Sequence, residues 1–163
     1  MNQVYISIGS NLDRSRYINQ AVQSLDELFA PMDISPVYES EAFGFEGDDF
    51  YNLVVAFKTD LPLEKLHQTL RQIEDANGRD RTAPKFSART LDLDILTFGE
   101  HINHQKPFDV PRDEITKMAF VLKPLFDIAA DAIHPELNQS YQTLWQAYDQ
   151  TKQPLTLIEF QYT

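Results

Sequence analysis

Asp92 and Asp94 occupy alternate positions in the segment R-T-L-D-L-D-I-L, residues 89–96. This alternation of apolar and acidic residues predicts a strand with two unlike faces. Both carboxylates then leave the same face, with their Cα atoms about 7 Å apart. Two carboxylates fixed in this way repel each other unless a cation or an arginine lies between them, and a magnesium ion shared with substrate phosphates suits the arrangement. The alternative is a solvated strand face that carries two ordinary surface acids.

The segment before these aspartates is locally basic, although the formal net charge of the chain is -11. Five of the fourteen basic residues lie between positions 71 and 89, namely Arg71, Arg79, Arg81, Lys85 and Arg89. Basic groups beside a carboxylate pair are what a polyphosphate ligand requires. Phosphoryl transfer in turn depends on metal-bridged oxygens, cationic donors and in-line positioning. The basic segment therefore favours a ligand site over a solvated face.

Composition limits the classes of protein and partner. A chain of 163 residues with 42% hydrophobic residues predicts one globular domain, residues 1–163. The lack of cysteine excludes disulfides and thiolate metal sites and is consistent with a cytoplasmic location. The start of the chain does not resemble a signal peptide, and no apolar run reaches membrane-spanning length. The acidic net charge argues against a nucleic-acid or anionic-membrane partner, and we expect a monomer.

Several common active-site motifs are missing. The sequence has neither a Walker-type phosphate loop nor a G-x-G-x-x-G fingerprint, so a nucleotide must be bound in another way. It has no G-x-S-x-G elbow for serine-based hydrolysis. The histidines lack a metal-binding spacing, and we expect each to be structural or exposed; they are His67, His101, His104 and His134.

The elements that must position the aspartates follow from periodicity. Residues 4–8 predict a strand, and the G-S-N at 9–11 suits either a simple strand-to-helix turn or a ligand-lining loop. A helix from about Ser15 precedes an edge strand at 33–39, which Pro36 weakens. The aromatics of loop 40–49 could form a stacking surface or a satellite cluster. A strand at 50–58 places Asn52 opposite its main apolar face. The next helix, with Asp60 as its expected cap and Pro62 in its first turn, ends at Gly78.

This order of strand, helix, strand, strand, helix, strand predicts an α+β fold of the ferredoxin-like type. It has a βαββαβ core, an antiparallel sheet with helices on one face, and a C-terminal extension. The other sheet face is free to carry the site. In the extension we expect a short apolar helix at 119–130 that is interrupted by Pro124, a helix capped by Ser140, and a last strand around Ile158 and Phe160.

Five motifs occur in a characteristic order: G-S-N-L at 9–12, F-Y-N at 50–52, I-E at 73–74 with G-R-D-R at 78–81, R-T-L-D-L-D-I-L at 89–96, and P-L-F-D-I-A at 124–129. With this combination the chain resembles the 6-hydroxymethyl-7,8-dihydropterin pyrophosphokinases of folate biosynthesis over nearly its whole length. The resemblance implies a ferredoxin-like fold and transfer of pyrophosphate from MgATP to the pterin hydroxymethyl group, with release of AMP.

The resemblance also implies residue roles. Asp92 and Asp94 would bind two Mg²⁺ ions, Asp94 would help accept the hydroxyl proton, and Arg79 and Arg89 would act on the phosphates. The pterin pocket would consist of Ser40, Ala42, Phe43, Phe50, Asn52 and Phe120. The ATP side would consist of Arg71, Glu74, Arg81, Phe86, Ile95 and Arg112.

The departures from the family pattern concentrate on the ATP side. Arg112 and Asp113 replace a His-Tyr pair, and Pro107, Asp109 and Met118 stand where Arg, Thr and Arg are expected. These changes leave two alternatives to an active pyrophosphokinase. One is a diverged homologue that binds a pterin-like ligand with weak or altered ATP chemistry, and the other is an unrelated two-metal phosphohydrolase.

Overall fold

The computed structural model describes residues 1–42, 46–83 and 88–163. A six-stranded antiparallel sheet has the order β5, β1, β4, β3, β6, and β2 also pairs with β4. The strands are β1 Asn2–Ser10, β2 Asp33–Ile34, β3 Val37–Ser40, β4 Phe50–Thr59, β5 Asp92–Phe98 and β6 Thr156–Ile158. The helices are α1 Arg14–Phe29, α2 Leu63–Ala76, α3 Glu114–Lys117, α4 Ala119–Ala129 and α5 Tyr141–Ala147. This arrangement confirms the predicted α+β class.

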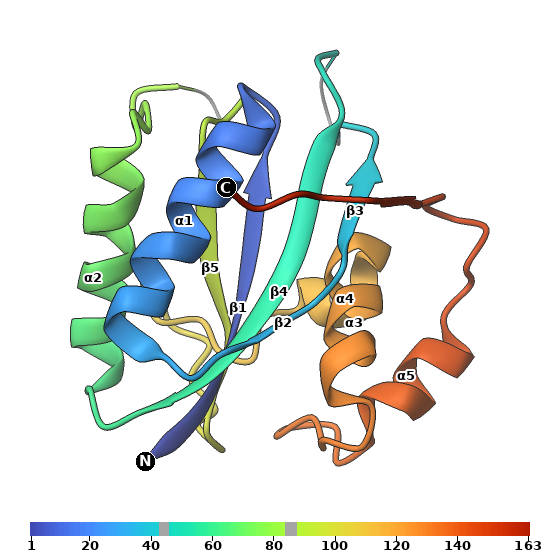
Figure 1. Ribbon diagram of the computed structural model, residues 1–163. Coiled ribbons are helices and arrows are strands. Elements are labelled where there is room, and N and C mark those ends of the chain that lie inside the picture. Colours follow the sequence, from blue (N-terminus) through green and yellow to red (C-terminus); the bar gives the residue numbers. More distant parts are fainter. Residues whose placement is uncertain (43–45, 84–87) are drawn as a thin grey trace.

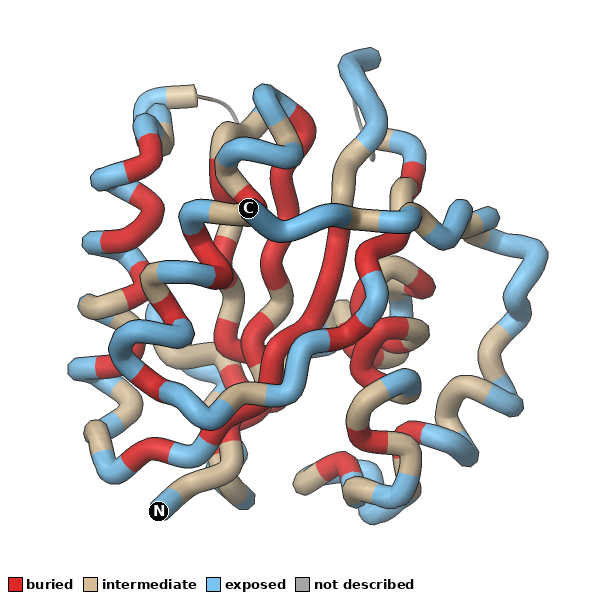
Figure 2. Tube along the Cα trace, in the orientation of Figure 1, coloured by how far each residue is buried: buried red, intermediate tan, exposed pale blue. Residues whose placement is uncertain are grey.

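The main core lies between the sheet and helices α1 and α2, which cover the same sheet face (Figure 1). Its members come from alternate positions of the strands and from the inward stripes of the two helices, and the centres of the strands are correspondingly buried (Figure 2). Ile6 on β1, Leu53 on β4 and Leu66 on α2 are all fully buried there. Burial of such side chains is the main force that holds the helices on the sheet.

Strand β5 serves both faces of the sheet because it contains a bulge. Leu93 and Ile95 point into the main core, so Asp92 and Asp94 lie on the opposite face, as predicted. Ile6 of β1 faces Ile95 but Tyr5 faces Thr97, which leaves Leu96 as an extra residue. Leu96 therefore packs against the second helical layer, whereas Phe98 returns to the main core.

The C-terminal extension supplies that second layer on the other side of the sheet. Helices α3, α4 and α5 pack around a separate apolar cluster that includes Val54, Leu96, Ile115 and Leu125. Helix α4 continues through Pro124, so the expected interruption there is wrong. The Oγ of Ser140 accepts a hydrogen bond from the backbone N–H of Thr143 and caps α5, as predicted. This layer leaves open the part of the face that carries Asp92 and Asp94.

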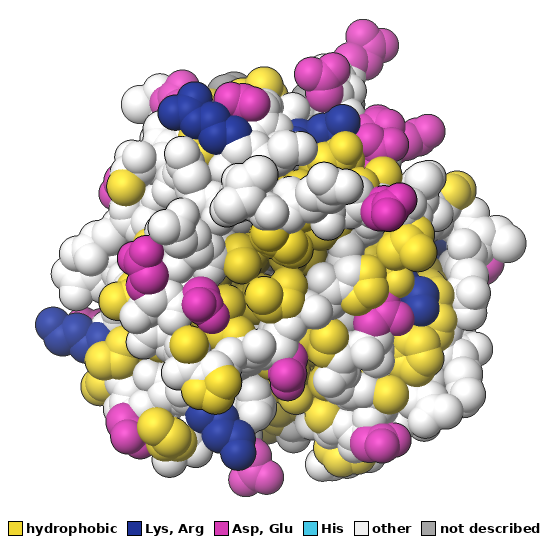
Figure 3. Space-filling model, viewed as in Figure 1, with side chains coloured by type: hydrophobic (Ala, Val, Ile, Leu, Met, Phe, Trp, Pro, Cys, Tyr) yellow, Lys and Arg dark blue, Asp and Glu magenta, His cyan; other side chains and the backbone are white. Residues whose placement is uncertain are grey.

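The chain then returns to the first face. Strand β6 pairs with β3, and the segment after it crosses the sheet and ends over α1 (Figure 1). Phe160 contacts Tyr51 edge-to-face, with ring centroids 6.2 Å apart, and the N–H of Thr163 donates to Asn19 Oδ1 over 3.0 Å. Figure 3 shows hydrophobic side chains at the centre of this face, next to the crossing segment.

The prediction of one edge strand at 33–39 is wrong in two respects. The segment is divided into β2 and β3 at Ser35 and Pro36, since proline cannot donate to a strand ladder. Strand β3 also lies inside the sheet, because β6 pairs with its outer side. In the described part of the chain, no helix has both the length and the apolar character needed to cross a membrane.

Candidate active site

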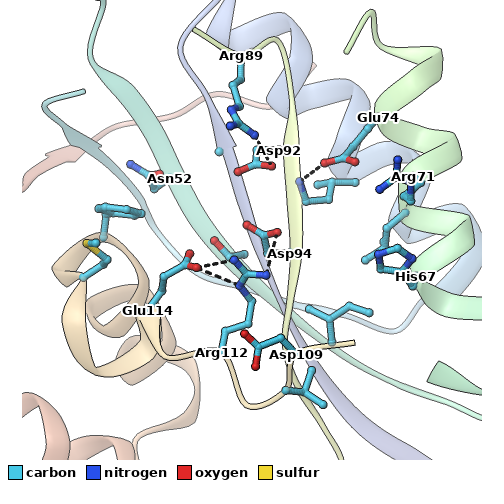
Figure 4. Close-up of a pocket in the computed structure, with 18 of the residues that line it drawn as sticks. Asn52, His67, Arg71, Glu74, Arg89, Asp92, Asp94, Asp109, Arg112 and Glu114 are labelled. Atoms are coloured by element: carbon cyan, nitrogen blue, oxygen red, sulfur yellow. Dashed lines mark hydrogen bonds and ion pairs between the residues drawn. The ribbon is translucent and has the colours of Figure 1, made fainter. Parts of the chain in front are cut away.

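A cavity of about 560 Å³ opens on the sheet face that carries the two aspartates and continues around the free edge of β5 toward α2. Its floor includes Ser7 and Asn52, and its walls come from α2, the residues around Arg89, the loop before α3, and the start of α4. Figure 4 shows Asp92 and Asp94 between Asn52 on one side and the α2 residues Glu74, Arg71 and His67 on the other. One cavity therefore joins the parts expected to bind pterin and nucleotide.

The carboxylates of Asp92 and Asp94 are surrounded by arginines. Arg79 donates to Asp92 Oδ1 over 2.9 Å and to the carbonyl of Leu91 over 3.0 Å, and Arg89 lies 3.6 Å from the same oxygen. On the other carboxylate, an Arg112 nitrogen lies 3.7 Å from Asp94 Oδ1. The aspartate side chains are only 32% and 26% exposed, so the alternative of a solvated strand face is wrong.

Asp94 is in an environment that disfavours its ionised form. Burial raises the pKa of its carboxyl group well above the usual range, and the negative charges of Asp92 and Glu114 raise it further. Burial alone would lower the pKa of Arg112, but Asp94 and Glu114 more than offset this effect. A cation at this position would favour the ionised carboxylate of Asp94.

Glu74 binds two of the arginines, Arg79 and Arg81. Its side chain is 6% exposed, and it accepts hydrogen bonds from Arg81 over 2.9 Å and from the N–H of Leu93 over 2.8 Å. Arg79 approaches the second carboxylate oxygen to 3.5 Å, while Arg81 also binds Asp75 over 2.8 Å. Burial raises the pKa of Glu74, in spite of these hydrogen bonds. Glu74 thus fixes the end of α2, the following loop and the edge of β5 in one place.

The other end of the cavity, called the uncharged end after the amide of Asn52 and the hydroxyl of Ser40, also has Glu41 in its lining. Asn52 is 4% exposed and donates from Nδ2 to the Oγ of Ser40 over 2.8 Å. Gly9 lies beside this amide, because a Cβ at that position would be 3.3 Å from Asn52 Oδ1. Phe50 and Phe120 complete the walls. An amide between aromatic walls is suited to the edge of a flat heterocycle.

Most of the residues predicted for the site line this cavity. They are Ser40, Phe50, Asn52, Arg71, Glu74, Arg79, Arg81, Arg89, Asp92, Asp94, Ile95, Arg112 and Phe120. Ala42 is not among the lining residues, and Phe43 and Phe86 lie outside the described residues. The positions that depart from the family pattern also line it: Pro107, Asp109, Asp113 and Met118.

Sequence reasoning missed several lining residues. Gly9 belonged to a motif whose role was left open between turn and ligand-lining loop, and the second reading is supported by its place in the cavity. His67 lies on the side of α2 away from the main core. Arg71, one turn later, was the only nearby residue that indicated a ligand site on this side. Glu114 and Lys117 come from the short helix α3, which has no apolar periodicity of its own to predict its orientation.

The donor set fits magnesium. Two carboxylates on adjacent same-face positions of a strand offer hard oxygen ligands, which this ion prefers together with water and phosphate oxygens. Burial is the main cause of the raised pKa of Asp94, and the carboxylates of Asp92, Glu114 and Glu74 add to it. In the described part of the chain, no group of three or more His, Cys, Asp or Glu side chains is gathered for a metal ion. Any metal here would therefore share its coordination with a ligand.

The sequence matches the family described as 7,8-dihydro-6-hydroxymethylpterin-pyrophosphokinase over residues 5–130. The chain is similar to the 2-amino-4-hydroxy-6-hydroxymethyldihydropteridine pyrophosphokinase of Aquifex aeolicus, with 36% identity over 83% of this chain and 85% of the relative. It is 34% identical to the Bacillus subtilis protein of the same name, over 88% of this chain and 90% of the relative.

A solved structure has the same fold as this chain. The wild-type HPPK-DHPS of Plasmodium falciparum, in its crystal structure with SDX-DHP, superposes with a TM-score of 0.66 at 16% identity. The match covers 90% of this chain and 43% of that chain. It supports the ferredoxin-like arrangement of the core.

Proposed function

We infer that this chain, which belongs to the 7,8-dihydro-6-hydroxymethylpterin-pyrophosphokinase family, transfers pyrophosphate from MgATP to 6-hydroxymethyl-7,8-dihydropterin. The product AMP is released. The observation that carries this proposal is the cavity that holds the Asp92–Asp94 pair, its arginines and the buried Asn52–Ser40 pair together. Arg112, Arg71 and Lys117 supply positive charge where Pro107 and Met118 lack it.

The pterin is proposed to bind at the uncharged end. Asn52 would read the edge of the ring, because its amide is 4% exposed and carries both a donor and an acceptor. Ser40 holds that amide in one orientation through their hydrogen bond. Phe43 and Phe120 would sandwich the ring, and Ala42 and Phe50 would line the same pocket. Exclusion of water around the amide strengthens these polar contacts.

The phosphates are proposed to lie over Asp92 and Asp94. The hydroxymethyl oxygen forms a bond to the β-phosphorus, the bond between that phosphorus and the α,β-bridging oxygen breaks, and AMP leaves with the electron pair. Two Mg²⁺ ions held by Asp92 and Asp94 would neutralise phosphate charge when bound. Arg79 and Arg89 would donate to the transferred group, and Asp94, whose pKa is raised, would help accept the hydroxyl proton.

The ATP side is proposed to include Arg71, Glu74, Arg81, Phe86, Ile95 and Arg112. Arg112 would bind phosphate oxygens, since a guanidinium forms a planar fork of donors. Glu74 would act through the arginines that it holds. We also propose that residues 1–163 function as one domain, because both helical layers pack on the same sheet, and that this domain acts as a monomer.

AMP formation tests the proposal directly. The protein is incubated with ATP, Mg²⁺ and 6-hydroxymethyl-7,8-dihydropterin, and AMP is measured with each component omitted in turn. We expect AMP only in the complete mixture and its loss in the Asp92→Ala variant. A wild-type protein that binds the pterin but forms no AMP above background would contradict the proposal.

A further inference from the structure

The loop from Asn103 to Val110 forms one wall of the cavity on the nucleotide side. The N–H of Asn103 donates to the carbonyl of Val110 over 2.8 Å, and the reverse hydrogen bond measures 2.9 Å, so the loop is closed at its base. Pro107, Phe108 and Asp109 line the cavity. The Asp109 side chain is labelled at the cavity wall below Asp94 and Arg112 in Figure 4.

This loop is held at two sides by histidines. On the α2 side, the ring of Phe108 contacts His67 edge-to-face with centroids 5.4 Å apart. On the other side, His104 Nε2 lies 2.9 Å from Glu136 Oε1 in the segment after α4. Glu136 is itself fixed, because its backbone N–H donates to Nδ1 of the buried His134 over 3.1 Å. The loop therefore bridges α2 and the C-terminal extension.

His104 has a carboxylate at each ring nitrogen. Its Nδ1 lies 2.9 Å from Asp109 Oδ1, opposite the contact of Nε2 with Glu136. A neutral imidazole has one N–H donor, whereas the imidazolium ion has two, so only the protonated ring can donate to both carboxylates. The carboxylates lie on opposite sides of the ring and therefore cannot share one metal ion with it.

In the described part of the chain, the ionisable groups that face this ring are Asp109 from its own loop and Glu136 from the segment after α4. The hydrogen bond with Asp109, followed by that with Glu136, raises the pKa of His104. All three side chains are between 40% and 48% exposed, so protons and salt reach them freely. The protonation of His104 can thus follow the pH of the solution.

We propose that His104 is a positioning residue for the nucleotide: as an imidazolium ion it holds Asp109 in place and offsets its negative charge beside the incoming triphosphate. When His104 loses its proton, one of the two carboxylates loses its donor, and the charge of Asp109 repels the nucleotide. Nucleotide affinity then falls as the pH rises through the titration of His104. This inference rests on the proposed function, because it assumes that ATP occupies this end of the cavity.

The test measures the binding of a magnesium complex of α,β-methylene-ATP by calorimetry at about pH 6 and about pH 8.5, on either side of the histidine range. Titration of the analogue itself is common to all proteins and cancels in the ratio of variant to wild type. At the lower pH we expect His104→Gln to weaken binding about two- to fivefold, the range of an exposed ion pair. At the higher pH the two proteins should bind equally.

A second pair of variants identifies the route. In an Asp109→Asn background, His104→Gln should have no effect on binding at either pH, because the charge that His104 offsets is gone. The matched control is His101→Gln: His101 precedes the loop and contacts the carbonyl of Phe98, so this variant should bind as the wild type does. Equal weakening by His104→Gln at both pH values, or weakening that persists in the Asp109→Asn background, would overturn the proposal.

Proton NMR of the imidazole ring gives a readout that is independent of catalysis. We expect the pKa of His104 to be raised in the wild type and to fall in Asp109→Asn, and an unchanged pKa in this variant would overturn the proposal. If the wild type forms no AMP but still binds the analogue with the expected dependence on pH and His104, the proposed function fails while the role of His104 is supported.

Discussion

The two ends of the cavity are held in opposite ways. At the uncharged end, Asn52 and Ser40 are buried and hydrogen-bonded to each other, on strands that are fixed inside the sheet. At the charged end, Asp92, Asp94 and Glu74 are bound to the arginines that a triphosphate would also need. The Asn52–Ser40 pair is already hydrogen-bonded, whereas the ion pairs of the charged end must exchange partners when a phosphate binds. We therefore expect ring recognition to depend on rigidity and phosphate binding on rearrangement of ion pairs.

The largest effect is expected from Asp94→Asn, which breaks the charged end at its centre. Removal of one preorganised electrostatic group costs about 10²–10³ in kcat. The ionised Asp94 is unfavourable in the folded protein, since its pKa is raised, so the variant should unfold at a higher temperature. Rate assays and thermal unfolding check both parts. Loss of activity together with loss of stability would mean that Asp94 is structural.

Arg89→Ala removes an arginine side chain that makes a long ion pair with Asp92. The guanidinium of Arg89 lies 3.6 Å from Asp92, a longer contact than the 2.9 Å hydrogen bond of Arg79. We expect kcat to fall about 10²-fold with little change in the KM for the pterin, because the group acts on developing phosphate charge. Steady-state kinetics with each substrate varied separate the two constants. A change confined to the pterin KM would place Arg89 at the wrong end of the cavity.

Asn52→Ala breaks the uncharged end instead. Ser40 loses its partner and the ring loses an edge donor and acceptor, at a cost of about 1–3 kcal/mol in pterin binding. Calorimetry with the pterin alone measures this cost. Binding of the magnesium complex of α,β-methylene-ATP in the absence of pterin serves as the control and should stay unchanged. Equal losses for both ligands would remove the distinction between the two ends.

Glu74→Gln tests whether pH dependence of stability arises at the charged end. The pKa of Glu74 is raised by burial, so its contribution to the free energy of unfolding is present below the ordinary glutamate range and is lost as the pH rises through the raised value. The free energy of unfolding of the variant should equal that of the wild type at low pH and should be larger than that of the wild type above this range. Urea unfolding across the pH series measures this difference. If the wild type became more stable than the variant as the pH rises, the prediction would be wrong.

The smallest effect is expected from Ser140→Ala, which lies outside both ends. This variant removes the hydrogen bond from the N–H of Thr143 that caps α5 and should cost about 1 kcal/mol of unfolding free energy. Activity at a temperature well below unfolding should be unchanged. The variant therefore shows how much a general loss of stability affects the assays, and reduced turnover would indicate that α5 contributes to the site.

The sequence was most informative where periodicity and burial agree. The alternation around Asp92 and Asp94 correctly predicted which side chains enter the core, because one face of β5 packs against helices. It could not predict the bulge at Leu96, since that depends on the pairing with Tyr5 and Ile6 of β1. The place of β3 inside the sheet and the role of His104 were also missed, because each depends on contacts with segments distant in sequence.

The outer edge of β5 affects the solubility of the protein. This strand is at the end of the sheet, and an open strand edge is a template for pairing with another chain. Arg79 donates to the carbonyl of Leu91, Glu74 accepts from the N–H of Leu93, and the N–H of Arg112 donates to the carbonyl of Leu96. Residues assigned to the ligand site thus also occupy backbone groups of this edge, and we expect them to oppose edge-to-edge aggregation.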